Sequence, residues 1–152
     1  MHGRSLHDEV LRVPMIVIPP AGRDDLPHGE IIADQVRLED VVPTVLEIVD
    51  ARPAPSRKLD GTSLLPLFTS TDPRTPRPVL AGYLRVEGDA SYAVRQDGYK
   101  LVVSSADGSS VLFDLQTDAG ETVDVASRKP ESVERLVAVA RDVGVALPRP
   151  GR

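Results

Sequence analysis

Two Asp-Gly pairs, Asp97-Gly98 and Asp107-Gly108, separate short apolar segments in the second half of the chain. Asp-Gly between two such segments is typical of a tight β-hairpin, because glycine readily adopts the positive φ that these turns need. The pairs therefore predict an antiparallel sheet of consecutive hairpins, which constrains this half of the chain more than any other feature. Its strands are expected at Val79–Val86, Ser91–Arg95, Tyr99–Ser104 and Ser110–Leu115.

An amphipathic segment follows this predicted sheet. Its apolar residues recur every three or four positions, which is the spacing of one face of an α-helix. Pro130 stands near the start of the segment and Gly144 just after its end, where helix termini favour these residue types. We expect this helix to pack on the sheet through Val133, Leu136, Val137, Ala140 and Val143.

The first half of the chain has a different pattern. Val13–Ile18 is a continuous apolar run rich in β-branched residues, and Pro19 and Pro20 close it. Such a run predicts a short strand that is buried on both faces, as in a parallel or mixed sheet. A second strand is expected at Ile31–Val36, after a loop rich in Gly, Asp and Pro.

Helical spacing begins at Asp40, a suitable N-cap residue, and ends near Ala51. Pro43 is tolerated in this helix because it lies in the first turn, where its missing N–H costs little. The segment Leu59–Phe68 predicts a turn and a short helical stretch that Pro66 stops. The apolar face of the first helix is expected to consist of Val41, Val42, Val45, Leu46 and Val49.

A Pro-rich stretch, Thr69–Pro78, separates these two patterns and predicts a boundary within the chain. We therefore expect an α/β fold in two parts. Residues 1–78 would form the tail end of an α/β sandwich, and residues 79–152 a small antiparallel sheet packed by one helix. The sandwich part contributes only two strands, so we expect it to be the less stable part.

Composition excludes several classes of function. The formal net charge is −5 and aromatic residues make up 3% of the chain, so nucleic acid is not the expected partner. The chain contains no cysteine, which rules out disulfides and thiolate metal sites. No apolar stretch approaches the ~20 residues of a membrane span, and no signal peptide is evident, so the compartment is left open.

Four stretches, taken in order, carry a resemblance to a known family. They are HGRSLHDEVLRVPMIV, VRLEDVVPTVLEIVDA, LDGTSLLPLF and GYKLVVSSADGSSVLFDLQTDAGETVDVA. Together they resemble the C-terminal part of the sulfatase family, within the alkaline phosphatase superfamily. The resemblance covers nearly the whole chain, and it implies that the sandwich and sheet are those of a sulfatase.

The resemblance also implies where the chemistry of the complete enzyme lies. The family hydrolyses sulfuric esters with a formylglycine made from Cys or Ser in a C/S-x-P-x-R motif, and with a divalent cation, usually calcium. Both belong to the N-terminal portion of the family, which this chain is expected to lack. In PAPSR the nucleophile position is Pro53, which has no group that can attack sulfur. In PHGE, Pro27 replaces the metal-binding Asp, so His28 and Glu30 are expected to be loop residues.

We therefore expect no catalytic residue and no metal ligand in this chain, which would be inactive alone. His2 is the one candidate substrate-binding residue. A sulfate ester needs cationic donors around its oxygens, and the resemblance places a Lys or His of this role just ahead of the RVP strand. Asp8 and Glu9 are expected to cap or salt-bridge this loop, and Arg12 to anchor the start of the strand.

Two other acidic residues, Asp114 and Asp118, are spaced as a general acid/base pair could be. A role in stabilising turns is the favoured interpretation, because Asp side chains accept hydrogen bonds from backbone N–H groups in such loops. Neither residue is therefore assigned to catalysis.

Two alternatives to the sulfatase segment stay open. The chain could be a non-catalytic module that pairs with a separately encoded catalytic chain, because an isolated Val13–Ile18 strand would expose apolar surface and unpaired edges. It could instead belong to another hydrolase of the alkaline phosphatase superfamily. The expected partners are accordingly the N-terminal catalytic portion, or a homologous chain, and a sulfate ester in the complete enzyme.

Overall fold

The computed structural model describes residues 5–54, 56–69, 77–84, 90–104 and 107–143. The chain divides into two compact units. The first, called here the helix unit, is Met15–Pro76, and the second, the sheet unit, is Met1–Pro14 together with Arg77–Arg152. Residues 1–14 are thus grouped with the sheet unit, whereas the sequence placed them with the first part of the chain.

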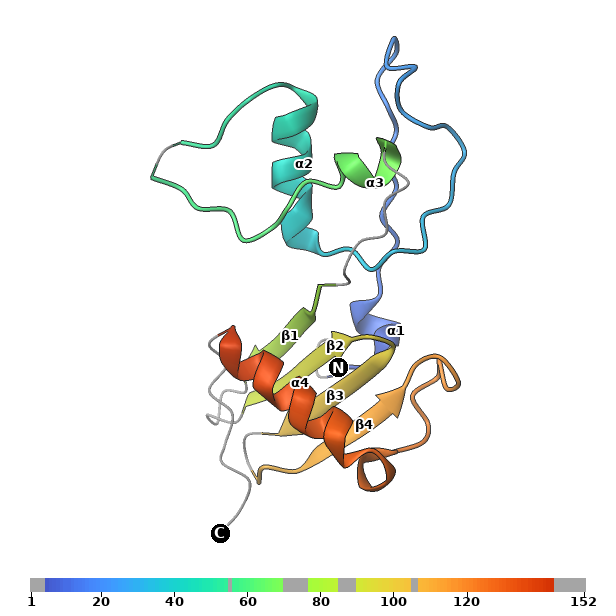
Figure 1. Ribbon diagram of the computed structural model, residues 1–152, viewed down its shortest axis with the longest axis vertical. Coiled ribbons are helices and arrows are strands. Elements are labelled where there is room, and N and C mark those ends of the chain that lie inside the picture. The colour runs from blue at the N-terminus through green and yellow to red at the C-terminus, as the bar shows by residue number, and fades with distance from the viewer. Residues whose placement is uncertain (1–4, 55, 70–76, 85–89, 105–106, 144–152) are drawn as a thin grey trace. The chain divides into compact units, whose positions relative to one another are not determined.

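The sheet unit contains a four-stranded antiparallel sheet with the strand order β1-β2-β3-β4 (Figure 1). This confirms the predicted hairpins. Gln96 pairs with Tyr99, and the two residues between them, Asp97 and Gly98, have φ values of 51° and 79°. A side chain at Gly98 would also meet Gln116, since its Cβ would lie 2.8 Å from the Gln116 amide nitrogen. The strands are β1 (Val79–Leu84), β2 (Ala90–Gln96), β3 (Tyr99–Ser104) and β4 (Ser110–Asp114).

One face of this sheet is covered by the helix α4, Pro130–Asp142, as predicted (Figure 1). Val143, which was expected on the packing face, follows the end of the helix and is exposed. Pro130 lies in the first turn of α4, where its fixed φ suits the helix. A short 3₁₀ helix, Ala126–Arg128, precedes α4. The predicted Gly144 cap lies outside the described residues. The apolar core between sheet and helix consists of Val94, Leu101, Val103, Leu112, Leu136 and Ala140.

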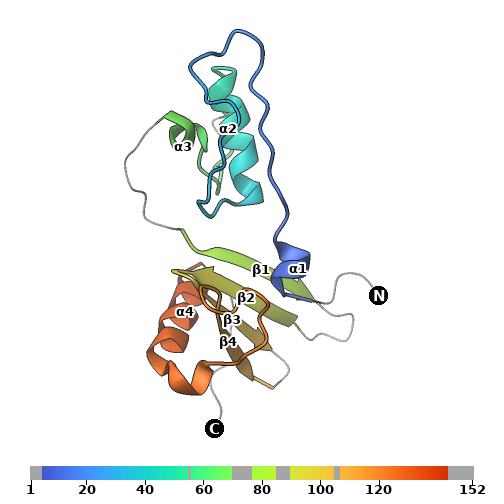
Figure 2. The same cartoon turned by 90° about the vertical axis from the view of Figure 1, so that its right-hand side faces the viewer.

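The N-terminal helix α1, Asp8–Leu11, lies against part of the other face of the sheet. Figure 2 shows α1 on the side of the sheet opposite to α4. Because side chains alternate along a strand, Lys100 points away from the face that carries Leu101. Lys100 is paired across the sheet with Arg95 and with Phe113. This second face is therefore polar where the start of α1 contacts it, through the hydrogen bonds of Asp8 with Arg95 and Lys100.

The helix unit contains three short helices and, in the part that the structure describes, no strand. They are a 3₁₀ helix at Leu38–Asp40, α2 at Val41–Ile48 and α3 at Leu65–Thr69. The predicted strands Val13–Ile18 and Ile31–Val36 are therefore wrong for this chain. A strand needs a neighbour to accept its hydrogen bonds, and among the described residues no strand lies beside these segments. Ile16, Ile18 and Ile31 are 82%, 85% and 94% exposed.

The helices predicted for this unit are present, but the prediction of which face of α2 is buried and the predicted effect of Pro66 are wrong. Val41, Val42, Val45 and Val49, predicted as the apolar face of α2, are exposed, and the buried residue of α2 is Thr44. Pro66 lies inside the first turn of α3 and does not stop it, because a proline at this position loses no helical hydrogen bond.

Candidate functional site

A cluster of charged side chains lies between α1 and the sheet, and we call it the Lys100 cluster: His7, Asp8, Arg95, Lys100 and Glu121. Lys100 Nζ lies 2.8 Å from Asp8 Oδ1 and 2.6 Å from Glu121 Oε1. Arg95 Nη1 lies 2.8 Å from Asp8 Oδ2. The Lys100 and Glu121 side chains are only 1% and 2% exposed. Two cations face two carboxylates, so the buried charges are compensated.

Glu121 also binds the backbone and the imidazole at the start of α1. Its Oε2 accepts hydrogen bonds from the Asp8 backbone N–H, at 2.9 Å, and from His7 Nδ1, at 2.7 Å. Since an ionised carboxylate only accepts, His7 carries a proton on Nδ1 in this arrangement. The His7 ring also contacts Phe113, with ring centroids 5.4 Å apart.

The connection between β4 and α4 presents Glu121 to this cluster. Glu121 has a φ of 54°, in the left-handed region that residues other than Gly seldom adopt. Asp118 holds the connection by accepting hydrogen bonds from the backbone N–H groups of Thr122 and Val123, at 2.8 Å each. These bonds, that from Val123 first, lower the pKa of Asp118 below its ordinary value. The turn role predicted for Asp118 is thereby confirmed.

Sequence reasoning found only part of this cluster. The predicted ion-pairing role of Asp8 is confirmed, whereas Lys100 and Glu121 were not singled out. The sequence did contain an indication of the role of Lys100, which stands in the apolar strand YKLVV. A charged side chain that is buried in such a strand requires a partner of opposite charge. His2, the predicted substrate-binding residue, lies outside the described residues.

The helix unit has a polar centre of its own, around Asp40, which is fully buried. Its carboxylate does not cap α2, as the sequence suggested. Instead it accepts hydrogen bonds from the Arg37 N–H, at 3.0 Å, and the Thr62 N–H, at 2.9 Å. Thr44 Oγ1 donates to the Asp40 carbonyl and accepts from the Leu64 N–H at 2.8 Å.

A glycine permits this close approach. A Cβ on Gly61 would lie 1.9 Å from the Glu39 carbonyl oxygen, so only glycine fits there. The stretches around Asp40 and Gly61 are therefore two halves of one structural element, and the sequence LDGTSLLPL packs against the start of α2.

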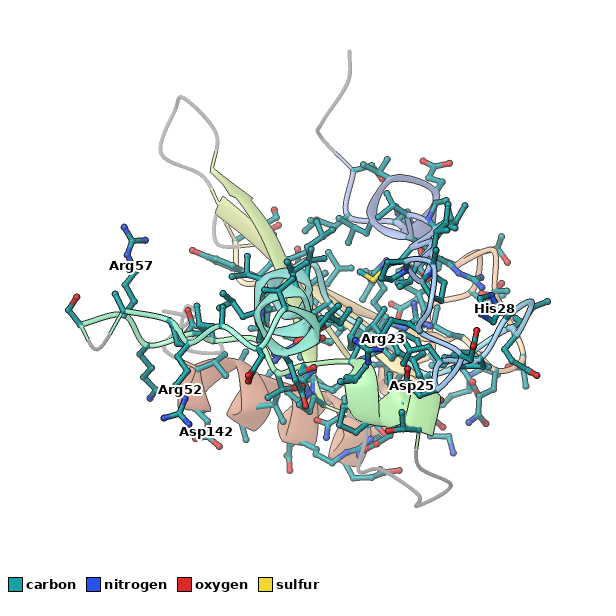
Figure 3. The ribbon with its side chains drawn as sticks, turned by 90° about the horizontal axis from the view of Figure 1, so that it is seen from above. Arg23, Asp25, His28, Arg52, Arg57 and Asp142 are labelled. Atoms are coloured by element: carbon teal, nitrogen blue, oxygen red, sulfur yellow. The ribbon has the colours of Figure 1, made fainter. Side chains whose placement is uncertain are left out.

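A cavity of about 330 Å³ also lies within the helix unit. Most of its lining is apolar, and His28, Glu30 and Asp34 contribute polar groups. His28 is exposed, as predicted. Figure 3 shows Arg23 and Asp25 close together, with His28 further along the same loop. Arg23 Nε lies 2.7 Å from Asp25 Oδ1, and this hydrogen bond lowers the pKa of Asp25.

A metal site needs several ligand side chains that converge on one point. Among the described residues, no three His, Asp or Glu side chains converge in a way that could hold a metal ion. Calcium needs several oxygen ligands around one point, so this part of the chain does not fit the cation that the resemblance implies. Within the same part of the chain, no helix is both long and apolar enough to cross a membrane.

Comparison with known families identifies one match over most of the chain. The profile of the family described as "N-sulphoglucosamine sulphohydrolase, C-terminal" matches residues 1–139.

Curated relatives agree with this match. Arylsulfatase K of Gallus gallus is 34% identical over 150 residues, which cover 91% of this chain and 27% of that protein. Arylsulfatase K of Xenopus laevis is 27% identical over the same shares. The chain therefore spans about a quarter of the length of these relatives.

Solved structures show the same fold. A structure described as a 2-O GAG sulfatase superposes with a TM-score of 0.60 at 19% identity, over 68% of this chain and 23% of that one. A second structure, solved in complex with its substrate D-glucosamine-2-N,6-O-disulfate, gives a TM-score of 0.55 at 17% identity, over the same shares. The mixed fold predicted from the sequence is thus confirmed as that of the C-terminal part of sulfatases.

Proposed function

Because the chain belongs to the family described as N-sulphoglucosamine sulphohydrolase, C-terminal, we propose that it serves as the C-terminal segment of an enzyme that hydrolyses sulfuric esters. The observation that carries the proposal is the family match over residues 1–139. The match favours a sulfatase over other hydrolases of the alkaline phosphatase superfamily.

In this proposal the nucleophile and the calcium ion belong to the N-terminal portion of the enzyme. The chain has no cysteine and no C/S-x-P-x-R sequence, and Pro53 stands where the nearest imitation of that motif needs its nucleophile. The described residues also offer no metal cluster. The catalytic chemistry is therefore assigned to a portion that corresponds to the unmatched part of the relatives. The matched part is 27% of the Gallus gallus protein.

The helix unit would contribute a docking surface for that N-terminal portion. Val13–Ile18 forms neither helix nor strand and exposes Ile16 and Ile18, and the valines of α2 are exposed as well. Exposed apolar side chains mark interaction sites when they gather in one patch, and an unpaired segment can join the edge of another sheet. The occupant we propose is the α/β portion of a sulfatase, whose sheet Val13–Ile18 would extend.

His2 would contribute to the active site of the complete enzyme. A protonated imidazole donates hydrogen bonds to anionic oxygens, which stabilises the charge that develops as the S–O bond breaks. The support for this role is its position ahead of the RVP sequence, Arg12–Pro14.

A second candidate differs only in how the N-terminal portion is encoded. The exposed apolar surface of the helix unit is equally suited to a catalytic portion on a separate polypeptide. Both candidates require a protein portion that carries the C/S-x-P-x-R motif.

The proposal is tested by arylsulfatase assays with para-nitrophenyl sulfate and added calcium. The chain alone is compared with a protein extended by the upstream reading frame, and with any protein that co-purifies with the chain from its source. We expect no turnover from the chain alone and turnover once a motif-bearing portion is present. Ile16→Lys should abolish that gain, whereas Glu134→Gln, an exposed change on α4, should leave it unchanged.

Two results would overturn the proposal. The first is metal-dependent turnover by the chain alone. The second is the absence of the motif both upstream and in every co-purifying protein.

A further inference from the structure

We propose that the cavity of the helix unit receives part of the N-terminal portion of the enzyme, in the form of an apolar side chain with a lysine or arginine beside it. That the occupant belongs to this portion rests on the proposed function. The chemistry of the occupant rests on the cavity itself, whose lining is mostly apolar and whose polar side chains are Glu30, Asp34 and His28.

The apolar part of the cavity is formed by segments that are distant in sequence. Met15 and Val17 come from the segment ahead of Pro19, whereas Leu67 and Phe68 come from α3. The volume of about 330 Å³ lies at the small end of the range for sites that bury a ligand, roughly 300–1,000 Å³. Apolar walls offer water few hydrogen-bond partners, and an apolar side chain would supply the van der Waals contacts that the walls lack.

Two carboxylates determine the charge that the occupant must carry. Glu30 and Asp34 line the cavity and are exposed, so they lie where the cavity meets solvent. Within the described part of the chain neither of them is paired with a cation, and the arginine of the same loop, Arg23, is bound to Asp25. Residues 19–36 contain four carboxylates and this one arginine. A lysine or arginine from outside the unit would complement this charge, and a carboxylate would be repelled.

The cavity is continuous with the apolar surface that we propose for docking. Ile18 lines the cavity and is 85% exposed, so it belongs to both. A strand laid beside Val13–Ile18 presents every second side chain to the same face, which brings its side chains within reach of the cavity. A free small molecule would fill the cavity but leave Ile16 and Ile31 exposed, so the observations favour an element of a protein partner.

The test uses three probes that share a phenyl ring on a two-carbon chain and differ in charge: phenethylammonium, phenethyl alcohol and hydrocinnamate. Spectra of the ¹³C-labelled chain report binding through Met15 and Phe68, which line the cavity. The chain contains one other phenylalanine, Phe113, which lies on β4 in the sheet unit and serves as the internal control.

Phenethylammonium should shift the signals of Met15 and Phe68 and leave that of Phe113 unchanged. It should bind about fivefold more tightly than phenethyl alcohol, because two exposed carboxylates each add a modest attraction. Hydrocinnamate should bind more weakly than the alcohol, because the same carboxylates repel it.

The variants separate the charge of the cavity from its apolar walls. Combining Glu30→Gln with Asp34→Asn should lower the affinity for phenethylammonium to that for phenethyl alcohol, and should leave the affinity for the alcohol unchanged. The matched control is Asp24→Asn, which removes a carboxylate of the same loop that does not line the cavity. This variant should keep the preference for the cation.

The protein extended by the upstream reading frame tests whether the N-terminal portion is the occupant. If it fills the cavity, Met15 should no longer respond to phenethylammonium in this longer protein. Combining Glu30→Lys with Asp34→Lys should lower its turnover of para-nitrophenyl sulfate at least about tenfold, because the two new cations repel the one that docks. Asp24→Lys should leave the turnover unchanged.

Equal affinities for the three probes would overturn the proposal, as would a preference for the cation that survives the loss of both carboxylates. A longer protein that turns over substrate while Met15 still responds to the probe would leave the proposed function intact and assign the cavity to a free organic cation. The expected order of affinities without turnover in the longer protein would support the chemistry of the cavity and contradict the proposed function.

Discussion

Lys100 Nζ lies 2.6 Å from Glu121 Oε1, and neither side chain is more than 2% exposed. This buried pair joins a central strand of the sheet to the connection ahead of α4. With Asp8 and Arg95 it forms a charge-balanced set, in which each ion depends on the others for compensation.

Removing one member of this set should destabilise the sheet unit strongly. Lys100→Met keeps the length of the side chain and leaves two carboxylates facing a single guanidinium, so we expect a loss of about 3–5 kcal/mol in the free energy of unfolding. Urea titration followed by circular dichroism measures it. Arg135→Gln breaks an ion pair that is 44% and 40% exposed and should cost less than about 1 kcal/mol. Equal losses in the two variants would contradict the compensation argument.

Gly61→Ala should disrupt the helix unit. The added methyl would lie 1.9 Å from the Glu39 carbonyl oxygen, so the backbone must separate and the hydrogen bonds of Asp40 to Thr62 are strained. We expect a loss of about 2 kcal/mol or more in stability. Gly120→Ala is the comparison, because its methyl would make only an ordinary contact, 3.5 Å from Thr122 Cγ2. Thermal melts of the two variants that superpose would refute this prediction.

Exposed apolar residues of the helix unit should contribute little to the stability of the isolated chain. Ile16 is 82% exposed, so Ile16→Lys should change the free energy of unfolding by less than about 0.5 kcal/mol. Leu64 is 4% exposed, and Leu64→Ala should cost about 2–4 kcal/mol. Chemical denaturation distinguishes them. A large loss from Ile16→Lys would mean that Val13–Ile18 is covered in solution.

Acid should weaken the sheet unit in part through Asp118. Its pKa is lowered in the folded protein, chiefly by the hydrogen bond from the Val123 N–H. The stabilisation is therefore complete above the unfolded pKa, about 3.9, and is lost as the pH falls through the lower folded value. Asp118→Asn should be less stable than the native chain at pH 6, and the difference should shrink below about pH 4. Stability curves that stay parallel from pH 6 to about pH 2 would exclude this role.

Much of the sheet unit could be predicted from short-range sequence features. The turn at Asp97-Gly98 could be predicted because Asp and Gly tolerate the positive φ values that such a turn needs, and both residues have them in the structure. The strand β3 begins at Tyr99 and ends at Ser104, as predicted, and α4 follows from a local apolar period that begins after Pro130.

Short-range sequence features predict the helix unit less well. Val13–Ile18 has the composition of a buried strand, yet a strand exists only beside a partner, and composition does not say whether one is present. The valines of α2 fall on one face as predicted, and that face is exposed because among the described residues no element covers it.

The sequence by itself determined the hairpins, the terminal helix, the absence of a sulfatase nucleophile motif and the family resemblance, because each depends on neighbouring residues or on residue identity. Only the tertiary structure decided that Lys100 is buried, that Glu121 and Asp8 neutralise it, and that the segment before Arg12 is bound to the second face of the sheet. Asp8 and Glu121 are separated by more than a hundred residues in sequence and bond to the same nitrogen. The physical reason is that burying a charge requires compensation in space, and residues distant in sequence supply it only once the chain has folded.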